Sequence, residues 1–575
     1  MNFAPHGPAL DSHCGCHTGE LLGALAPEVG AGFAASGPAD RPGPAGELVV
    51  RGRVCTMNPA QPSAEAIAVA DGRITAIGSY DEIRGYTGAD ATLLDVGDRV
   101  VYPGFIEPHM HYWSSALTFD WIDCATRGGV GFEEIAARLR QAEPVVGEWV
   151  LGQLFDPSLV EGERPLSRDV LDEIQPDRPC AVIDASQHFV YCNSRALELA
   201  GITEDTLDPE GGFLGRDENG RLNGALGEIP AMIRIIGALP TTSPERLVEN
   251  LLRVNAYAAS RGYTRTHDAA TGVLRGPEEV EIFRRLAPRF DVRVSFAVHD
   301  YAMDAVLAAG TAAFEGDDMC RATSWKFVSD GSNQGRSGYQ REPYLGRNAR
   351  GEVNYDRATL AGRLRRAHEL GWQVMVHANG DAAIDLALDA FEEALGGTSG
   401  LGRRHRIEHC SFAHPEQLDR MARLGISPSF LINHVYFWGQ AFEDRIVGPE
   451  KARLLDPVGG ARRRGMRVSV HSDYTVTDLD PLREIQVQVT RERFGGTPLN
   501  PDEAVGVEDA VRAKTVDAAW QTHCDDVAGS IEVGKYADLV VLDADPCEVD
   551  PERIAEIEVL RTIVGGRTVY DASSI

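Results

Sequence analysis

The middle of this 575-residue chain alternates short apolar segments with amphipathic helical ones, and this alternation most constrains the fold. Helical patterns cover residues 356–371, 381–396 and 414–425 between the apolar segments. Eight strands joined by helical crossovers predict an α/β protein with a (β/α)8 barrel, whose catalytic groups sit at the C-terminal strand ends. The predicted strands are GFIEPHMH (104–111), TRTHD (264–268), VRVSFAVHD (292–300), SWKFVSD (324–330), VMVHANG (374–380), RIEHC (406–410), ISPSF (426–430) and RVSVHSD (467–473).

Both ends of the chain are rich in strand patterns punctuated by tight turns. The turn ADGR separates two alternating apolar runs near the start, which is a hairpin signal. We expect residues 47–100 and 524–575 to form one small β-sandwich from both chain ends. The barrel would then occupy 101–523, with a subdomain of about 112–263 inserted after its first strand, because that crossover is far too long for one helix.

Residues 1–46 are rich in Gly, Ala and Pro and are predicted to be a flexible leader. They contain HCGCH, with His13, Cys14, Cys16 and His17. We interpret this cluster as incidental thiols in a tail, with a metal or redox site as the alternative.

The composition of the chain excludes some classes of binding partner. A formal net charge of −30 argues against nucleic acid and against anionic membrane surfaces. We find no apolar run long enough to span a membrane and no secretory signal. Ten cysteines scattered thinly over the chain suit reduced thiols. These features predict a cytoplasmic protein that acts on a small molecule, and they are compatible with a homodimer.

Polar side chains stand at or near the C-terminal ends of five predicted strands. They are His109 and His111, Lys326, His377, His409 and Asp473. Imidazoles and a carboxylate are ligands for divalent transition metals, with zinc as the default and other metals open. A buried lysine can lose its charge, and its neutral amine can add carbon dioxide to form a carbamate (N6-carboxylysine) that bridges two ions.

Each of these residues has an alternative interpretation. The H-x-H pair could be two solvated histidines, Lys326 a salt-bridged lysine and Asp473 a helix cap. His377 and His409 could be hydrogen-bonded core histidines. Because all six fall where a barrel gathers its side chains, we favour a centre for one or two metal ions.

Several motifs resemble the metal-dependent amidohydrolase superfamily, specifically its YtcJ-like branch, which includes N-substituted formamide deformylases. The motifs are PGFIEPHMH, KFVSDGSNQGRSGYQREPY, VHANGDAAID, RIEHC, HSDYTVTDLDPLREI and GSIEVGKYADLVVLDADP. The resemblance runs from about residue 47 to the end and implies a barrel with a composite β-sandwich, bound metal and hydrolysis of C–N bonds. Glu107-Pro108 departs from the family's usual Asp-Ala or Asp-Ser beside the first ligands.

The expected mechanism is metal-assisted hydrolysis. His109, His111 and Asp473 would hold one ion, His377 and His409 a second, and carboxylated Lys326 would bridge them. Asp473 would accept the proton of the attacking water and pass it to the leaving nitrogen. If Lys326 is unmodified, a one-metal version keeps the same role for Asp473.

Candidates for substrate contacts are His188 in the insertion, Trp113 after the H-x-H, and Arg336, Tyr339 and Gln340 in the loop after the fourth strand. An esterase or lactonase remains open, because the same nucleophile attacks any carbonyl. A ring-amidine deaminase would carry H-x-x-E after the fifth strand, where VHANGDAA offers Asn379 and Asp381 instead. A non-catalytic binding homologue would lack a ligand, and none is missing.

Overall fold

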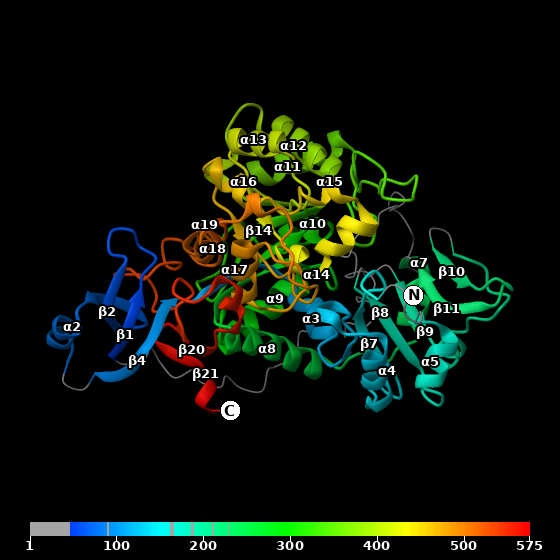
Figure 1. Cartoon of the computed structure of the whole chain (residues 1–575), viewed down its shortest axis with the longest axis horizontal. Coiled ribbons are helices and arrows are strands. Elements are labelled where there is room, and N and C mark those ends of the chain that lie inside the picture. Colours follow the sequence, from blue (N-terminus) through cyan, green and yellow to red (C-terminus); the bar gives the residue numbers. More distant parts are fainter. Residues whose placement is uncertain are drawn as a thin grey trace.

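The computed structural model describes residues 47–88, 91–160, 166–185, 189–209, 212–227 and 229–574. The predicted leader with its HCGCH cluster lies outside the described residues, and so does His188. The described chain forms three sheets: an eight-stranded barrel in the centre, a sheet made from both chain ends, and a sheet in the insertion (Figure 1). In Figure 1 the latter two lie on opposite sides of the barrel.

The barrel confirms the predicted fold. All neighbouring strands pair in parallel, and seven ladders join the eight strands in chain order. These strands are buried along most of their length, as parallel strands covered on both faces must be. The strands are β5 (Phe105–Met110), β12 (Tyr263–Thr271), β13 (Arg293–His299), β14 (Cys320–Val328), β15 (Gln373–Ala378), β16 (Arg406–His409), β17 (Ser427–Phe430) and β18 (Ser469–Val470).

The first and last strands are held together by backbone bonds just past the end of β18. Asp473 N donates to His109 O at 3.2 Å, and His111 N donates to Tyr474 O at 3.0 Å. Ser472 N also donates to the Glu107 side chain at 3.3 Å. The segment that carries Asp473 is therefore fastened directly alongside the H-x-H motif.

The predicted helices form where their apolar periodicity places them: α11 (Arg357–Glu369), α12 (Asp381–Leu395) and α13 (Pro415–Leu424). Helix α12 buries Ile384, Leu388 and Phe391, which lie on one face at helical spacing. It ends at Gly396, whose φ of +57° is the left-handed conformation that a helix C-terminus favours and that glycine adopts without a Cβ clash.

Strands from both chain ends pair into one continuous seven-stranded sheet. The predicted hairpin joins β2 to β3 through Asp71 and Gly72, with φ of +50° and +75°, as a tight two-residue turn requires. The order in the sheet is β21 (Arg567–Asp571), β20 (Val559–Val564), β19 (Leu539–Leu542), β4 (Thr92–Pro103), β1 (Leu48–Cys55), β2 (Ser63–Ala70) and β3 (Arg73–Gly78).

The insertion contributes a mixed six-stranded sheet. Helix α8 (Pro244–Ser260) follows it and buries Leu247, Leu251 and Val254 on one face, with β12 next to it in the chain and in space. This helix serves as the barrel crossover, so the separate insertion sheet ends before it. We propose that the three sheets mark three folding units. The insertion strands are β6 (Ile122–Asp123), β7 (Val150–Phe155), β8 (Cys180–Asp184), β9 (Phe189–Cys192), β10 (Phe213–Arg216) and β11 (Leu222–Gly227).

Two further observations concern the described residues only. None of their helices combines the length and apolar character needed to cross a membrane. The eight cysteines among them form no disulfide with one another.

Candidate metal centre

Six predicted residues converge at the C-terminal end of the barrel. His109 lies in β5, Lys326 in β14, His377 in β15 and His409 at the end of β16. His111 precedes helix α3 (Tyr112–Leu117), and Asp473 follows β18 by three residues. Because parallel strands end at one edge, residues that are far apart in the sequence meet there.

Asp473 lies close to both histidines of the first predicted ligand set, His109 and His111. Its Oδ1 lies 3.0 Å from His111 Nε2 and 3.4 Å from His109 Nε2. Lys326 Nζ, fully buried, lies 3.2 Å from the same His109 Nε2. The side-chain amine that we expect to be carboxylated therefore faces this histidine–aspartate group.

His409 links the two predicted ligand sets. Its ring centroid lies 5.1 Å from that of His109 and 4.5 Å from that of His377. One ligand atom each from His109, His409 and Asp473 lie within 4.8 Å of one another. His409 has a φ of +64°, a conformation that few non-glycine residues adopt and that recurs at functional sites.

Glu408, which was not among the predicted site residues, orients His109. Its Oε2 lies 2.6 Å from His109 Nδ1, and both side chains are fully buried. Its Oε1 lies 2.9 Å from Arg406 Nε. A carboxylate on Nδ1 leaves Nε2 directed at the cluster, the usual arrangement around a metal-binding histidine. A signal was present: Arg406 and Glu408 are charged residues two apart in a short buried strand.

His471, two residues before Asp473, was also absent from the predicted site residues. Its ring stacks on that of His109, with centroids 4.5 Å apart and planes 12° apart. Both of its ring nitrogens are buried and have no hydrogen-bond partner among the described residues. Buried polar atoms are normally satisfied, so an ion that accepts a nitrogen ligand here would explain the arrangement. His471 also groups with His109 and Glu408 as three donors within 4.8 Å.

Burial keeps the central imidazoles neutral. Burial is the main cause that lowers the pKa of His109 well below its usual value, and the nearby charge of Lys326 adds to it. Burial likewise lowers the pKa of His471, although the charge of Asp473 opposes the shift. A neutral imidazole offers the lone pair that a metal ion needs, so this donor set fits a divalent transition metal.

Asp330 holds the loop beside His377. Its carboxylate accepts from Asn379 N at 3.0 Å, Gly380 N at 2.8 Å and Tyr339 N at 2.8 Å, and it lies 3.4 Å from His377 Nε2. Burial raises the pKa of Asp330 to about 6, against the opposing effect of His377 and these amides. The loop after β14 is thereby tied to the end of β15.

The unusual Glu107 belongs to a buried ion network below the cluster. Lys514 Nζ lies 3.2 Å from Glu107 Oε2 and 2.7 Å from Glu484 Oε2, and all three side chains are fully buried. Glu107 also accepts from His109 N at 3.2 Å. Its longer side chain reaches Lys514, so in this structure the departure from the family pattern supports the backbone of the first ligands.

The predicted substrate contacts occupy different surroundings. Arg336 lines a cavity of about 610 Å³ between the loop after β14 and the insertion, together with Phe189 and Tyr191. Tyr339 lies in the same loop, and its carbonyl packs tightly against Gly380. The other two described candidates, Gln340 and Trp113, are buried and do not line this cavity.

Gln340 is 1% exposed and donates to Asn333 Oδ1 at 2.6 Å and to Tyr344 Oη at 3.1 Å. Trp113 is 4% exposed and packs on Phe283, with ring centroids 5.2 Å apart. Gln340 therefore stabilises its own loop by hydrogen bonds, and Trp113 packs in the hydrophobic core.

Known proteins match this chain along most of its length. A family model described as the amidohydrolase family matches residues 92–570. The chain is 31% identical to an N-substituted formamide deformylase of Arthrobacter pascens over 91% of this chain and 98% of that protein. It is 27% identical to the amidohydrolase YtcJ of Bacillus subtilis (strain 168), over 88% of this chain and 96% of that one.

A solved structure shares the fold. It is an uncharacterized metal-dependent hydrolase from Pyrococcus horikoshii OT3, with a TM-score of 0.70, 23% identity, and coverage of 88% of this chain and 99% of that one. With the family model spanning most of the sequence, the chain belongs to the amidohydrolase family, in the YtcJ-like branch that the sequence motifs predict.

Proposed function

We propose that this protein hydrolyses an N-substituted formamide, taking up one water and releasing formate and the corresponding amine. As an amidohydrolase, the chain is a hydrolase of carbon–nitrogen bonds other than peptide bonds. The formamide is the finer part of the proposal, and it is supported by similarity to the Arthrobacter pascens deformylase along nearly the whole of both chains.

The observation that carries the proposal is the convergence of histidines on Asp473, whose Oδ1 lies within 3.4 Å of both His109 Nε2 and His111 Nε2. Together with Lys326, His377 and His409, these residues would hold one or two divalent ions, with zinc as the first choice. A bound ion of this kind supplies Lewis acidity, which lowers the pKa of water to about 7 and polarises a carbonyl.

Side chains of the protein would then transfer the proton of the attacking water and hold the ligands in position. Asp473 accepts the proton of the attacking water and returns it to the amine nitrogen as the C–N bond breaks. Glu408 keeps His109 in the orientation and tautomer that turn Nε2 toward the cluster. Asp330 and its three amide donors keep the loop after β14 in place beside His377.

The cavity beside Arg336 is the proposed place for the nitrogen substituent. Its volume of about 610 Å³ falls within the range of small-molecule sites. Gly331 O lies 3.2 Å from His377 Nε2, and Gln334 of the cavity wall is three residues further on. Three residues span at most about 11 Å, so the cavity adjoins the cluster.

The test is a comparison of substrate classes with the purified, metal-loaded protein. We expect formate and amine in equal amounts from an N-substituted formamide, and a slower reaction with an ester or a lactone. Ammonia release from a ring amidine without formate would overturn the proposal. His109→Ala serves as the inactive control, because it removes the central imidazole.

Three finer points belong to the same proposal: zinc as the metal, carbamate formation at Lys326, and a cytoplasmic location. The location is supported by the eight described cysteines, which form no disulfide with one another. Metal analysis together with intact mass under mild conditions tests the first two. About two ions per chain that fall together in Lys326→Ala would support a bridged pair, and one unaffected ion would support the one-metal form.

A further inference from the structure

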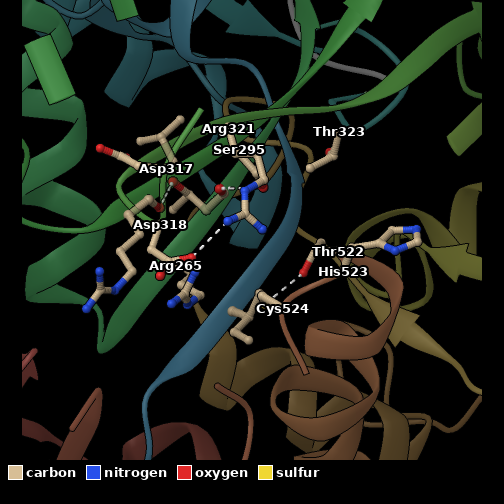
Figure 2. A pocket seen from close by; sticks show the side chains of 13 residues that line it. Arg265, Ser295, Asp317, Asp318, Arg321, Thr323, Thr522, His523 and Cys524 are labelled. Carbon is tan, nitrogen blue, oxygen red and sulfur yellow. Dashed lines mark hydrogen bonds and ion pairs between the residues drawn. The ribbon is translucent and has the colours of Figure 1, made fainter. Parts of the chain in front are cut away.

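A small cavity lies at the opposite end of the barrel from the metal centre. It is lined by residues at the beginnings of β5, β12, β13 and β14, and by Thr522–Cys524, which follow α19 (Val516–Gln521). Figure 2 shows Arg265, Asp318 and Arg321 on one wall, with Thr522, His523 and Cys524 across from them. The cavity holds about 20 Å³, which is room for about one water-sized sphere.

Arg265 brings guanidinium donors without hydrogen bonds to this cavity. Its Nε and Nη2 are buried and have no hydrogen-bond partner among the described residues. The carboxylate in ion-pair range is Asp538, whose Oδ2 lies 3.5 Å from Nε. That carboxylate is already engaged by Arg293, at 2.9 Å and 3.2 Å.

The buried part of the wall therefore carries an excess positive charge. The side chains of Arg265 and Arg293 are 10% and 7% exposed, and that of Asp538 is 3% exposed, so two guanidinium groups share one carboxylate. A guanidinium does not give up its proton in a protein. Buried donors without an acceptor are costly, so a negatively charged acceptor in the cavity would stabilise the fold.

The other acidic groups of the wall lie nearer the surface, and Asp318 interacts electrostatically with Arg265 without a hydrogen bond to its Nε or Nη2. Asp318, 26% exposed, accepts from Tyr536 Oη at 2.5 Å and from Arg321 Nη2 at 3.0 Å. Asp317 is exposed, and its Oδ1 accepts from Met319 N and Cys320 N at 2.7 Å and 3.0 Å.

The groups on the facing loop are neutral near pH 7. Burial lowers the pKa of His523 to about 4, and burial raises the pKa of the Cys524 thiol. Asp525, the next residue, is paired with Arg404 Nη1 at 2.6 Å, and Asp526 is exposed. The facing loop therefore supplies no buried negative charge to Arg265.

We propose that this cavity binds a monovalent anion of chloride size, held by the Nε and Nη2 donors of Arg265. Larger oxyanions such as sulfate exceed the space. Asp538 precedes β19 of the terminal sheet and accepts from Gly565 N at 2.8 Å, so the bound anion sits where the barrel floor meets that sheet. Occupancy therefore stabilises this junction and leaves the chemistry at the far end of the barrel unchanged.

The first experiment measures Tm at constant ionic strength while sodium gluconate is replaced stepwise by sodium chloride or bromide. We expect a saturable rise of about 1–2 °C in the wild type, from preferential binding to the folded state. Arg265→Gln should abolish the halide response. The matched control is Arg284→Gln, which removes an arginine paired with Glu315 at 2.8 Å and should keep it.

The second experiment detects the ion directly. Binding of chloride should broaden the ³⁵Cl NMR line of the wild-type solution, and a bromide-soaked crystal should give an anomalous peak beside Arg265. Chloride bound at the metal centre would persist in Arg265→Gln and is thereby distinguished. The crystal result also covers the case in which Arg265→Gln does not fold. A wild-type Tm indifferent to halide, or a crystal with water and no bromide at this position, would overturn the proposal.

Discussion

Replacing Glu408 with glutamine keeps the size of the side chain and removes the charge that orients His109. In the structure one carboxylate serves two donors, with Oε2 2.6 Å from His109 Nδ1 and Oε1 2.9 Å from Arg406 Nε. Glutamine has a single acceptor oxygen, so one of these two donors must face its amide NH₂ group. Either way, the charge-assisted hydrogen bond to His109 Nδ1 is weakened or lost and the ion pair with Arg406 is removed, in a fully buried place.

The size of the effect follows from that loss. A hydrogen bond to a charged group contributes about 1.5–3 kcal/mol. Loss of a carboxylate behind a metal-binding histidine weakens metal affinity by about 10–100-fold. We therefore expect Glu408→Gln to bind Zn²⁺ about 10–100-fold more weakly, measured by competition with a chromophoric chelator at pH 7.5.

The fold of this variant has to be checked separately, because Arg406 is left buried without its counter-charge. Removing one partner of a buried pair costs about 3–5 kcal/mol, so urea unfolding of the metal-free proteins should show a loss of up to that size. Glu416→Gln is the control, since Glu416 is an exposed partner of Arg341 at 2.9 Å. A folded Glu408→Gln protein with Zn²⁺ affinity within twofold of wild type would refute the role of Glu408.

Three further changes test other parts of the structure. Asp473→Asn should lower kcat by about 10²–10⁴-fold, as expected for loss of a proton acceptor, and an unchanged kcat in stopped-flow or steady-state assays would exclude that role. Lys514→Met should lower the free energy of unfolding in urea by about 3–5 kcal/mol, because Glu107 and Glu484 would stay buried without their cation. A loss below about 1 kcal/mol would contradict this ion network. Asp381 is partly desolvated by burial, which raises its pKa, but bonds from His414 at 3.1 Å and Lys451 at 2.8 Å outweigh this and lower the pKa to about 2. A lowered pKa stabilises the folded state at pH values above the unfolded pKa, and this stabilisation is lost as the pH falls. Asp381→Asn should therefore lower the free energy of unfolding by about 2 kcal/mol at pH 7 and by roughly half of that at about pH 3. A loss that stays the same between about pH 7 and about pH 3 would contradict this assignment.

Much of the barrel could be predicted because its signals are local. A strand reveals itself by a short apolar run, and a helix such as α12 by the spacing of Ile384, Leu388 and Phe391. Parallel strands end at one edge, so polar residues at strand ends could be assigned to one place before their distances were known. That reasoning brought together His109, His111, Lys326, His377, His409 and Asp473.

The residues that were missed depend on contacts between distant segments. Charged residues in the short strand around Glu408 gave a signal and His471 gave none, but only the approach of β16 and β18 to β5 places both residues against His109. The longer side chain of Glu107 is explained only by its contact with Lys514, which lies some 400 residues later in the chain.

The sequence by itself determined the periodic elements, the barrel they build and the edge at which its polar residues gather, because spacing and burial are written in neighbouring residues. Only the tertiary structure decided which of those residues touch, and it buried Trp113 against Phe283 and closed Gln340 inside its own loop. The physical reason is that hydrogen bonds and ion pairs form between atoms within about 4 Å, and chain order does not specify which distant atoms come that close.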